Sequence, residues 1–239
     1  MLPLERQNAY RARYAAQRPG WRASGDEFEA RLRRWLRPDS RVLDVGCGRG
    51  GVMELFWQTV ALATGVDADP ASLREQRTGM PVACGLAGAL PFAGASFDLV
   101  LGLWLLEHLE RPSEALLEIR RVLRPGGRFL FLTPNARHPL LWANRLGQWL
   151  PALQRRLVPA LYGRAEADTF RVHYQANTPA RLRQLAGACG FQVDRLDVIA
   201  DPSYLAFNEA LFRLSTALEA VLPPDWGVHL LGDWVRAPD

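Results

Sequence analysis

The 239 residues alternate short apolar runs with longer amphipathic stretches, as expected for strands and helices that follow one another. The runs lack a strict alternation of apolar and polar residues, which is typical of strands buried on both faces of a parallel sheet. They lie at 41–45, 60–66, 82–84, 97–103 and 128–133. Two further strands are expected at 191–199 and 228–235. The pattern predicts an α/β fold.

Between these runs, apolar residues recur at the three- and four-residue spacing of helices. Ser24–Glu27 has the spacing of a capping box and opens one such stretch. The apolar face of this helix is formed by Phe28, Leu32, Trp35 and Leu36. Further helices are expected at 52–56, from Pro112 to Leu123, from Pro179 to Gly190 and at 203–221.

Arg41–Gly51 reads as a buried strand that ends in an acidic residue and runs into a glycine-rich turn. Glycine lets the backbone turn sharply and lets a ligand approach main-chain N–H groups. About twenty residues on, a second strand ends at Asp67, where nucleotide-binding folds place a ribose-binding carboxylate. Asp67 has two acceptor oxygens for two vicinal hydroxyls, and its alternative role is to cap the helix near Pro70.

These stretches resemble motif I and the later motifs of the class I S-adenosylmethionine (SAM)-dependent methyltransferases. Within that family they are most similar to the methyltransferase type 11 group, which is like the ubiquinone/menaquinone methyltransferases. The matches occur in order and at the right spacing over residues 41–135. Beyond the glycine turn they comprise Leu90–Phe92, Ser96–Val100, Leu106–Leu109 and Glu118–Gly127. A glycine turn alone also fits an NAD site, but the ordered matches favour the methyltransferase family.

The resemblance implies a Rossmann-like, doubly wound sheet of seven strands in the order 3-2-1-4-5-7-6, with strand seven antiparallel. We expect a single domain over 1–239, with an N-terminal lid and helix at 1–37 and a helical substrate-cap insertion at 136–177. The implied donor is SAM and the implied product is S-adenosylhomocysteine. The resemblance implies these cofactor-binding residues: Asp44, Gly46, Cys47, Gly48, Gly50, Asp67, Ala68, Leu86, Ala87, Leu103 and His108.

One stretch departs from the family pattern. Where the family has Gly-Asp-Ala-Glu, this chain has Gly-Leu-Ala-Gly at 85–88, so no carboxylate is available there for the adenine amino group. Adenine binding would then depend on backbone groups near Leu86 and Ala87 and on apolar stacking. His108 follows strand four, and we expect a residue of the turn there rather than a catalytic base.

Ligands of open α/β sheets bind beyond the carboxyl ends of the strands, which places Trp104 beside the transferring methyl group. Trp104 lines the acceptor site or faces the sulfonium, which its ring would attract by a cation–π interaction, or, alternatively, it belongs to the core. The N-terminal segment is a lid or a solvated leader, and its aromatic residues favour the lid. The expected substrate-binding residues are Tyr10, Tyr14, Trp21, Trp104 and Trp142.

The insertion at 136–177 carries apolar residues at helical spacing with arginines on other faces, and Pro151 is expected to kink its helix. This pattern predicts a cap over the methyl acceptor. It also fits a basic amphipathic helix that lies on a membrane surface.

Methyl transfer is an in-line displacement, so orientation of the acceptor supplies much of the acceleration. A general base helps when the acceptor has a high pKa. Of the four histidines, His138 and His173 are expected to reach the acceptor, with Tyr174 as a hydrogen-bonding orienter. Either histidine is alternatively a satisfied residue of the cap. His229 falls in the last strand, where we expect it to lie away from the site.

Composition narrows the choice of function. The net charge is only +4, every basic residue is Arg, and no block of like charges occurs, so a nucleic-acid partner is not indicated. Three cysteines without a Cys-x-x-Cys spacing favour neither a disulfide framework nor a metal site. The N-terminus lacks the apolar core of a signal peptide, and no run is long enough to span a membrane, so we expect a cytoplasmic protein without stable membrane insertion.

The sequence therefore predicts a SAM-dependent methyltransferase (EC 2.1.1.-) that acts, as a monomer or homodimer, on an O, N or C atom of a small apolar or aromatic metabolite, such as a natural product. Two alternatives stay open. The first is a SAM-binding module without its own catalysis, and the second is an NAD-dependent oxidoreductase.

Overall fold

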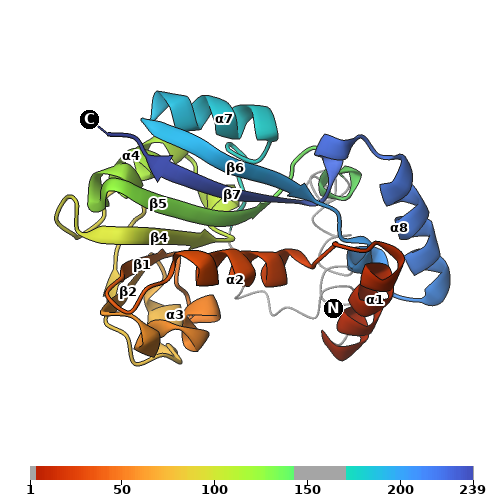
Figure 1. The fold of residues 1–239 in the computed structure, drawn as a ribbon, viewed down its shortest axis with the longest axis horizontal. Coiled ribbons are helices and arrows are strands. Elements are labelled where there is room, and N and C mark those ends of the chain that lie inside the picture. Colours follow the sequence, from red (N-terminus) through yellow and green to blue (C-terminus); the bar gives the residue numbers. More distant parts are fainter. Residues whose placement is uncertain (1–3, 143–170, 239) are drawn as a thin grey trace.

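The computed structural model describes residues 4–142 and 171–238. Its centre is a seven-stranded sheet in the order β3-β2-β1-β4-β5-β7-β6 (Figure 1). β7 is antiparallel to both of its neighbours, and the pairs from β3 to β5 are parallel, so the predicted order and direction are confirmed. The strands are β1 (Arg41–Val45), β2 (Leu62–Asp67), β3 (Val82–Cys84), β4 (Phe97–Leu103), β5 (Leu123–Pro134), β6 (Phe191–Ile199) and β7 (His229–Arg236).

Helices cover both faces of the sheet. α4 and α7 lie on one face and α2 and α3 on the other, while α1 and α8 lie beyond the end at which β4 and β6 point (Figure 1). The helices are α1 (Leu4–Gln17), α2 (Ser24–Trp35), α3 (Pro70–Arg74), α4 (Pro112–Val122), α7 (Pro179–Ala188) and α8 (Glu209–Val221). Short 3₁₀ turns are η1 (Gly51–Leu55), η2 (Trp57–Thr59), η3 (Leu106–His108), η5 (Pro202–Leu205) and η6 (Pro224–Trp226).

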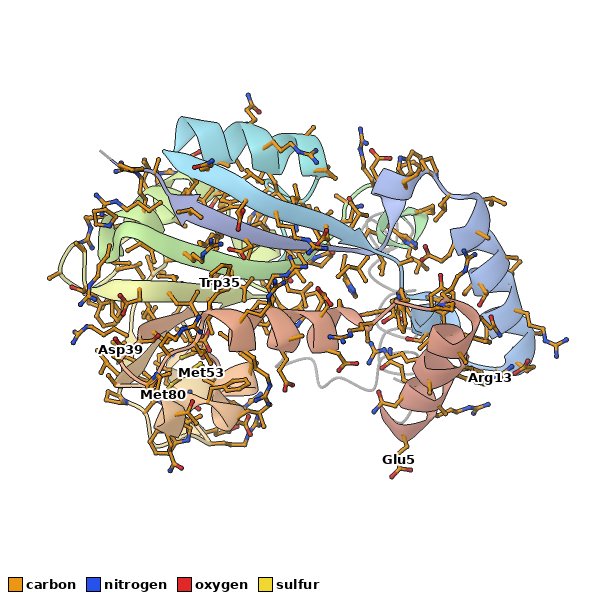
Figure 2. All side chains as sticks on the ribbon, in the orientation of Figure 1. Glu5, Arg13, Trp35, Asp39, Met53 and Met80 are labelled. Carbon is orange, nitrogen blue, oxygen red and sulfur yellow. The ribbon has the colours of Figure 1, made fainter. Side chains whose placement is uncertain are left out.

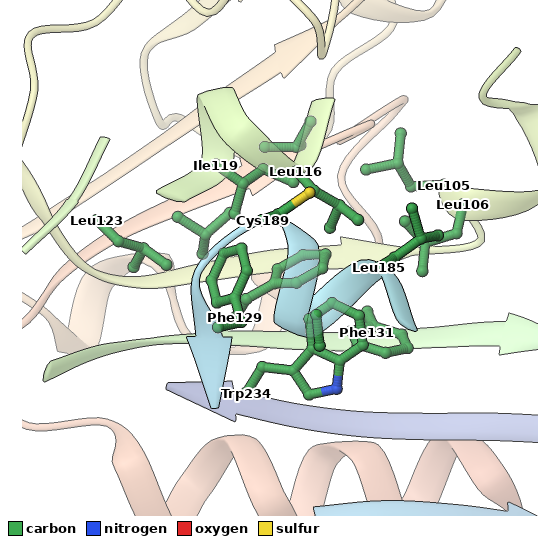
Figure 3. Close-up of a cluster of buried hydrophobic side chains, with 14 of the residues drawn as sticks. Leu105, Leu106, Leu116, Ile119, Leu123, Phe129, Phe131, Leu185, Cys189 and Trp234 are labelled. Atoms are coloured by element: carbon green, nitrogen blue, oxygen red, sulfur yellow. The ribbon is translucent and has the colours of Figure 1, made fainter. Parts of the chain in front are cut away.

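Each face of the sheet has its own core. Under α4 and α7, Trp234 packs edge-on against Phe131, with ring centroids 4.8 Å apart, and Phe129 lies beside both rings (Figure 3). On the opposite face, Phe28 and Leu32 of α2 are fully buried, as their helical spacing predicts. Each such side chain contributes roughly 1.5–3 kcal/mol by leaving water, so the two cores hold the strand ends in place.

Polar contacts also tie α2 to the sheet. Trp35, which is labelled in Figure 2, donates from its indole N–H to Asp233 of β7 at 2.8 Å. The guanidinium of Arg128 lies 3.4 Å from the centre of the Trp35 ring and donates to the same aspartate. Cation–π stacking and a shared carboxylate thus join α2, β5 and β7.

Four local expectations are wrong. Ala23, not Ser24, caps α2, and no side chain accepts a hydrogen bond there. The stretch after the glycine turn forms only the 3₁₀ turn η1. The helix expected at 203–221 is split into η5 and α8, because the Asn208 side chain accepts from Leu211 N–H and starts α8 anew. β5 begins at Leu123 and not at the expected Arg128. Its register against β4 shifts between these two residues, where Gly126 has a φ of +77°.

Residues 143–170 of the predicted 136–177 insertion, which include Pro151, lie outside the described residues. Within the residues that are described, no helix combines the length and the apolar character that crossing a membrane requires.

A pair of glycine substitutions tests the packing of the sheet. A Cβ at Gly232 would collide with the ring of Phe131, whereas a Cβ at Gly187, in α7, would meet nothing within 4 Å. We expect Gly232→Ala to destabilise the protein by about 1–3 kcal/mol through overpacking. Gly187→Ala should stabilise it by about 0.5–1 kcal/mol, because alanine loses less entropy in a helix. Urea denaturation of both variants measures the difference, and equal midpoints would contradict the packing described here.

Candidate active site

The glycine turn closes the end of β1 onto the end of β2. The N–H groups of Gly46 and Cys47 donate to the carbonyl of Val66 at 2.8 and 3.2 Å. Gly46 has a φ of +78° and Gly50 a φ of +136°, values that residues other than glycine rarely adopt. The turn is therefore fixed by glycine conformations that the sequence motif predicts.

Asp67 holds this turn from the neighbouring strand. Its carboxylate accepts a hydrogen bond from Gly48 N–H at 2.8 Å and another from Asp69 N–H at 2.8 Å. The cap of α3 is Asp69, whose side chain accepts from Ala71 and Ser72, so the alternative role of Asp67 as a helix cap is wrong. A carboxylate has about four lone-pair sites, so Asp67 keeps capacity for further donors.

Negative charge is concentrated where β1 and β2 end. Burial raises the pKa of Asp44 to about 7, and the charge of Asp67 adds to the rise. Burial also raises the pKa of Cys47 to about 12, with the charges of both aspartates contributing, so the buried thiol stays protonated. A cationic ligand at this edge would relieve the repulsion between the two carboxylates.

Gln76, which was not expected at the site from the sequence, contacts the glycine turn. Its Nε2 donates to the carbonyl of Gly48 at 3.1 Å, and its Oε1 stands 2.8 Å from where a Cβ on Gly50 would be. The backbone N–H of Arg77 donates to the carbonyl of Arg49 at 2.9 Å. No motif signal marks these residues, because their contact with the turn depends on how α3 returns to the sheet.

The stretch expected to face adenine lies beside the end of β2. Gly85 N–H donates to the carbonyl of Asp67 at 3.0 Å, which brings the 85–88 turn to the same edge. Leu86 is 65% exposed, and Ala68 is exposed as well, whereas Ala87 packs partly against the core. An exposed apolar side chain at this edge offers a surface on which a flat ring can stack.

Trp104 lies at the carboxyl end of β4, directly after the half-buried Leu103. It is 38% exposed, so its alternative role as a core aromatic is wrong. Its φ is +53°, a left-handed conformation that is unusual for a bulky residue, and its N–H donates to Leu132 at 2.8 Å. Such strain persists only where surrounding structure holds it, and it is concentrated at functional sites.

His229 is not remote, contrary to the expectation from its place in the last strand. β7 is antiparallel, so its first residue lies at the carboxyl end of β5, opposite Pro134. The His229 ring meets Trp104 edge-on with centroids 5.0 Å apart, and it meets Tyr204 at the same separation.

The segment that carries His173 and Tyr174 lies against η3. Both residues donate their backbone N–H groups to the carbonyl of Glu107, at 2.7 and 3.2 Å, and Tyr174 has a φ of +52°. The Nδ1 of His108 lies 2.9 Å from the carbonyl of Arg171, which fits the expected turn role. The structure thus brings His108, His173 and Tyr174 together at the end of β4.

Glu107 is a second residue that the sequence analysis passed over. Its side chain is buried and accepts from the Thr133 hydroxyl at 2.9 Å, while Asn177 donates to the same hydroxyl at 2.6 Å. Burial raises the pKa of Glu107 to about 7. This network joins η3, β5 and the segment before α7, and its polar groups support the edge on which Trp104 sits.

His138 has no free ring nitrogen. It is 1% exposed, its Nδ1 accepts from Leu140 N–H at 3.2 Å, and its Nε2 lies 3.1 Å from a carboxylate oxygen of Glu219. Because Nδ1 is an acceptor, Nε2 carries the proton that bonds to Glu219. This geometry contradicts a role for His138 as catalytic base and gives it the alternative role of a satisfied residue that holds α8.

Three of the five expected substrate residues form a small core of their own. Tyr10 and Tyr14 are buried against Phe212 of α8, and Trp21 donates from its indole N–H to the carbonyl of Ala200 at 2.7 Å. Their aromatic faces therefore hold α1 to α8, which corrects the expectation that they contact an acceptor. Arg13, which is labelled in Figure 2, forms an ion pair with Glu209 of α8 and supports the same contact.

Trp142 keeps an exposed aromatic face. It is 46% exposed, its indole N–H donates to the carbonyl of Ala136 at 2.9 Å, and its ring meets Trp226 edge-on at 5.4 Å. Trp104 and Trp142 are thus the expected substrate residues that present rings to solvent.

Comparison with known proteins agrees with this geometry. Residues 43–131 match the family model described as a methyltransferase domain. The phthiotriol/phenolphthiotriol dimycocerosates methyltransferase 1 of Mycobacterium ulcerans is 35% identical over 73% of this chain and 66% of its own length. The ubiquinone biosynthesis O-methyltransferase of Parvibaculum lavamentivorans is 32% identical over 56% of this chain and 54% of its own. The chain thus spans about half to two thirds of these relatives.

Solved structures show the same fold at low identity. A putative methyltransferase from Bacillus halodurans superposes with a TM-score of 0.60, at 16% identity, over 89% of this chain and 100% of its own. The [4+2]-cyclase SpnF superposes with a TM-score of 0.56, at 16% identity, over 92% of this chain and 87% of its own. A fold shared with a cyclase does not by itself decide the reaction.

The ordered motifs, the glycine turn held by Asp67, the sheet order and the matched domain agree with one another. The chain belongs to the class I SAM-dependent methyltransferases, with residues 43–131 as its methyltransferase domain.

Proposed function

We propose that this protein transfers the methyl group of SAM to a small-molecule acceptor and releases S-adenosylhomocysteine. The observation that carries the proposal is the glycine turn between β1 and β2, held by Asp67 and flanked by the buried carboxyl of Asp44. Bound SAM would supply a methyl group on a positively charged sulfonium.

The residues at this edge fit the parts of SAM. The carboxylate of Asp67 offers its remaining lone pairs to the two ribose hydroxyls. The turn from Gly46 to Gly50, with Cys47 and Gly48, receives the methionine end, and Asp44 complements its positive charge. Ala68, Leu86 and Ala87 provide an apolar surface for the adenine, and Leu103 and His108 border the sulfonium.

On the acceptor side, the protein must orient the nucleophile opposite the sulfur and exclude water. We propose that Trp104 and Trp142 face the acceptor, since both present rings to solvent. His173 and Tyr174 stand beside η3, and we propose them as groups that orient the acceptor.

An apolar or aromatic acceptor fits this lining, because tryptophan rings offer large apolar faces on which a flat ring can stack. The names of the relatives, which include a ubiquinone O-methyltransferase and a phthiotriol methyltransferase, point in the same direction. A free-standing enzyme, either monomer or homodimer, is the simplest form of this proposal.

The direct test is transfer of label. Wild-type protein incubated with SAM labelled in its methyl group and an extract of small metabolites should yield labelled small molecules. Binding of SAM without any transfer would favour the alternative of a non-catalytic SAM-binding module. Binding of NADH in place of SAM would favour an oxidoreductase.

Asp67→Asn tests the ribose contact. The amide keeps the size of the side chain but loses one acceptor oxygen and the negative charge, and hydrogen bonds to charged groups are worth about 1.5–3 kcal/mol. Calorimetry should therefore show an increase of roughly tenfold or more in the dissociation constant for SAM. The control is Asp39→Asn, an exposed residue at the opposite end of β1 (Figure 2). If the two variants bind SAM equally well, the assignment of Asp67 is wrong.

The raised pKa of Asp44 predicts a pH dependence of SAM binding. Below about pH 7 the carboxyl is protonated in the free protein, and a cationic ligand favours the carboxylate, so binding should release a proton. The affinity for SAM should therefore rise as the pH increases towards 7 and level off above it. Calorimetry in buffers of different ionisation enthalpy measures the released proton.

Asp44→Asn should abolish that proton release, because an amide does not titrate. The same shift makes a second prediction for the unliganded protein. The folded pKa of about 7 lies above the unfolded value of about 3.9, so the free energy of unfolding should fall as the pH rises between these values. An affinity for SAM that stays constant from about pH 5 to about pH 8 would refute this role for Asp44.

A further inference from the structure

We propose that His229 takes the proton from the group that is methylated. That group is then a hydroxyl, and the product is a methyl ether. The inference rests on the proposed methyltransferase function and goes beyond it by naming the acceptor atom and the residue that receives its proton.

His229 holds an unsatisfied polar atom. The side chain is 2% exposed, and its Nδ1 has no hydrogen-bond partner. A buried donor or acceptor that is left unpaired destabilises the fold, so such atoms in folded proteins call for an explanation. A ligand group that completes the hydrogen bond is one explanation, and the position of His229 supports it.

That position is at the carboxyl edge of the sheet, where ligands of this fold class bind. His229 pairs with Pro134 at the end of β5 and with Ile199 at the end of β6. Its ring contacts Trp104, the residue directly after β4 that is partly exposed and has a left-handed backbone. A strained aromatic residue and an unsatisfied imidazole therefore meet at one contact. Movement of the Trp104 ring would open His229 to an acceptor.

The backbone before His229 is held firmly. The Asn135 side chain donates to the carbonyls of Asp225 and Gly227 at 2.9 and 2.8 Å, and Asn135 N–H donates to Val228 at 2.8 Å. A Cβ on Gly227 would stand 2.8 Å from the backbone of Ile199, so this glycine permits the close approach. A group placed on rigid backbone keeps its orientation, which is what a catalytic side chain requires.

The surroundings keep the imidazole neutral. Burial lowers the pKa of His229 to about 3, and the positive charge of Arg11 adds to the effect. Arg11 of α1 is itself paired with the buried Asp201, and His138 with Glu219, while Trp104 and Tyr204 supply the rings at its sides. A neutral imidazole with an unprotonated Nδ1 accepts a hydrogen bond from a hydroxyl.

The chemistry of the step is balanced. The acceptor oxygen uses a lone pair to form the new O–CH₃ bond, and the S–CH₃ bond breaks with its electron pair going to sulfur. The O–H electrons stay on oxygen, the proton passes to Nδ1 of His229, and the imidazolium later returns it to water. An oxygen that has gained a methyl group while still protonated is a much stronger acid than imidazolium, so even a weakly basic imidazole takes its proton.

Among the described histidines, this geometry distinguishes His229 from His138. Both ring nitrogens of His138 are engaged, by Leu140 and by Glu219, so His138 has no position for a substrate proton. A nitrogen acceptor would have to reach the site as a neutral amine, because an ammonium has no lone pair for the methyl group, whereas a neutral hydroxyl needs no prior loss of a proton.

Two variants separate a chemical role from a structural one. His229→Asn places an amide oxygen near the position of Nδ1 and keeps an acceptor that cannot take a full proton. His229→Phe keeps an aromatic ring against Trp104 and removes the acceptor. Both should bind SAM as tightly as the wild type. His229→Asn should keep KM for the acceptor but lose about 100-fold or more in kcat, and His229→Phe should lose both.

A readout that does not require turnover is the ¹⁵N resonance of the His229 Nδ1, identified by its absence from the spectrum of His229→Asn. In cofactor-free protein this resonance should shift when p-cresol is added and should not shift with toluene, the matched hydrocarbon without a hydroxyl. A resonance that p-cresol leaves unchanged would overturn the proposal even if His229→Phe failed to fold.

The products decide the remaining outcomes. Wild-type label found in methyl ethers supports the proposal, whereas label on nitrogen or carbon overturns it and leaves the methyltransferase function intact. Unchanged kcat in folded His229→Phe also overturns it. If the wild type binds no SAM, the proposed function itself fails, which the SAM titration reports separately.

Discussion

The hydrogen bond from Gly48 N–H to the carboxylate of Asp67 is the contact on which the rest of the candidate site depends. It joins the end of β2 to the turn after β1 at the edge where a ligand binds. Gln76 and the 85–88 turn are then brought to that edge by contacts with the Gly48 carbonyl and the Asp67 carbonyl. Without it, the glycines would have the freedom to adopt many conformations.

The parallel strands make this arrangement possible. In a parallel sheet the carboxyl ends of neighbouring strands lie on one edge, so residues far apart in sequence meet there. Asp44 and Asp67 lie at the carboxyl ends of β1 and β2, and Trp104 follows β4, so the three border one edge of the sheet. Two buried cores, one on each face, hold the strands in place beneath these side chains.

Much of this could be read from the sequence, because local rules govern it. The glycine turn and the short strands from β1 to β4 follow from apolar runs and from the conformations that only glycine adopts. The sheet order came from the resemblance to a family, and the structure confirms it. Local rules failed at Ser24, where the capping spacing is present but the helix begins one residue earlier than a Ser24 cap would allow.

Tertiary contacts explain what the sequence could not reveal. Tyr10 and Tyr14 are aromatic residues in a polar segment, and only the position of α8 shows that they form a core with Phe212. His138 and His229 have the same side chain and opposite surroundings: a carboxylate and an N–H group satisfy one, and aromatic rings surround the other. Sequence spacing carries no information about either environment.

The central claim is that the turn between β1 and β2 binds the aminoacyl nucleoside. A crystal structure of the protein with S-adenosylhomocysteine tests it most directly. We predict that the ribose hydroxyls donate to the carboxylate of Asp67 and that the aminoacyl end lies on the turn from Gly46 to Gly50. Electron density for the ligand at any other place, with Asp67 still bonded only to protein, would contradict the account.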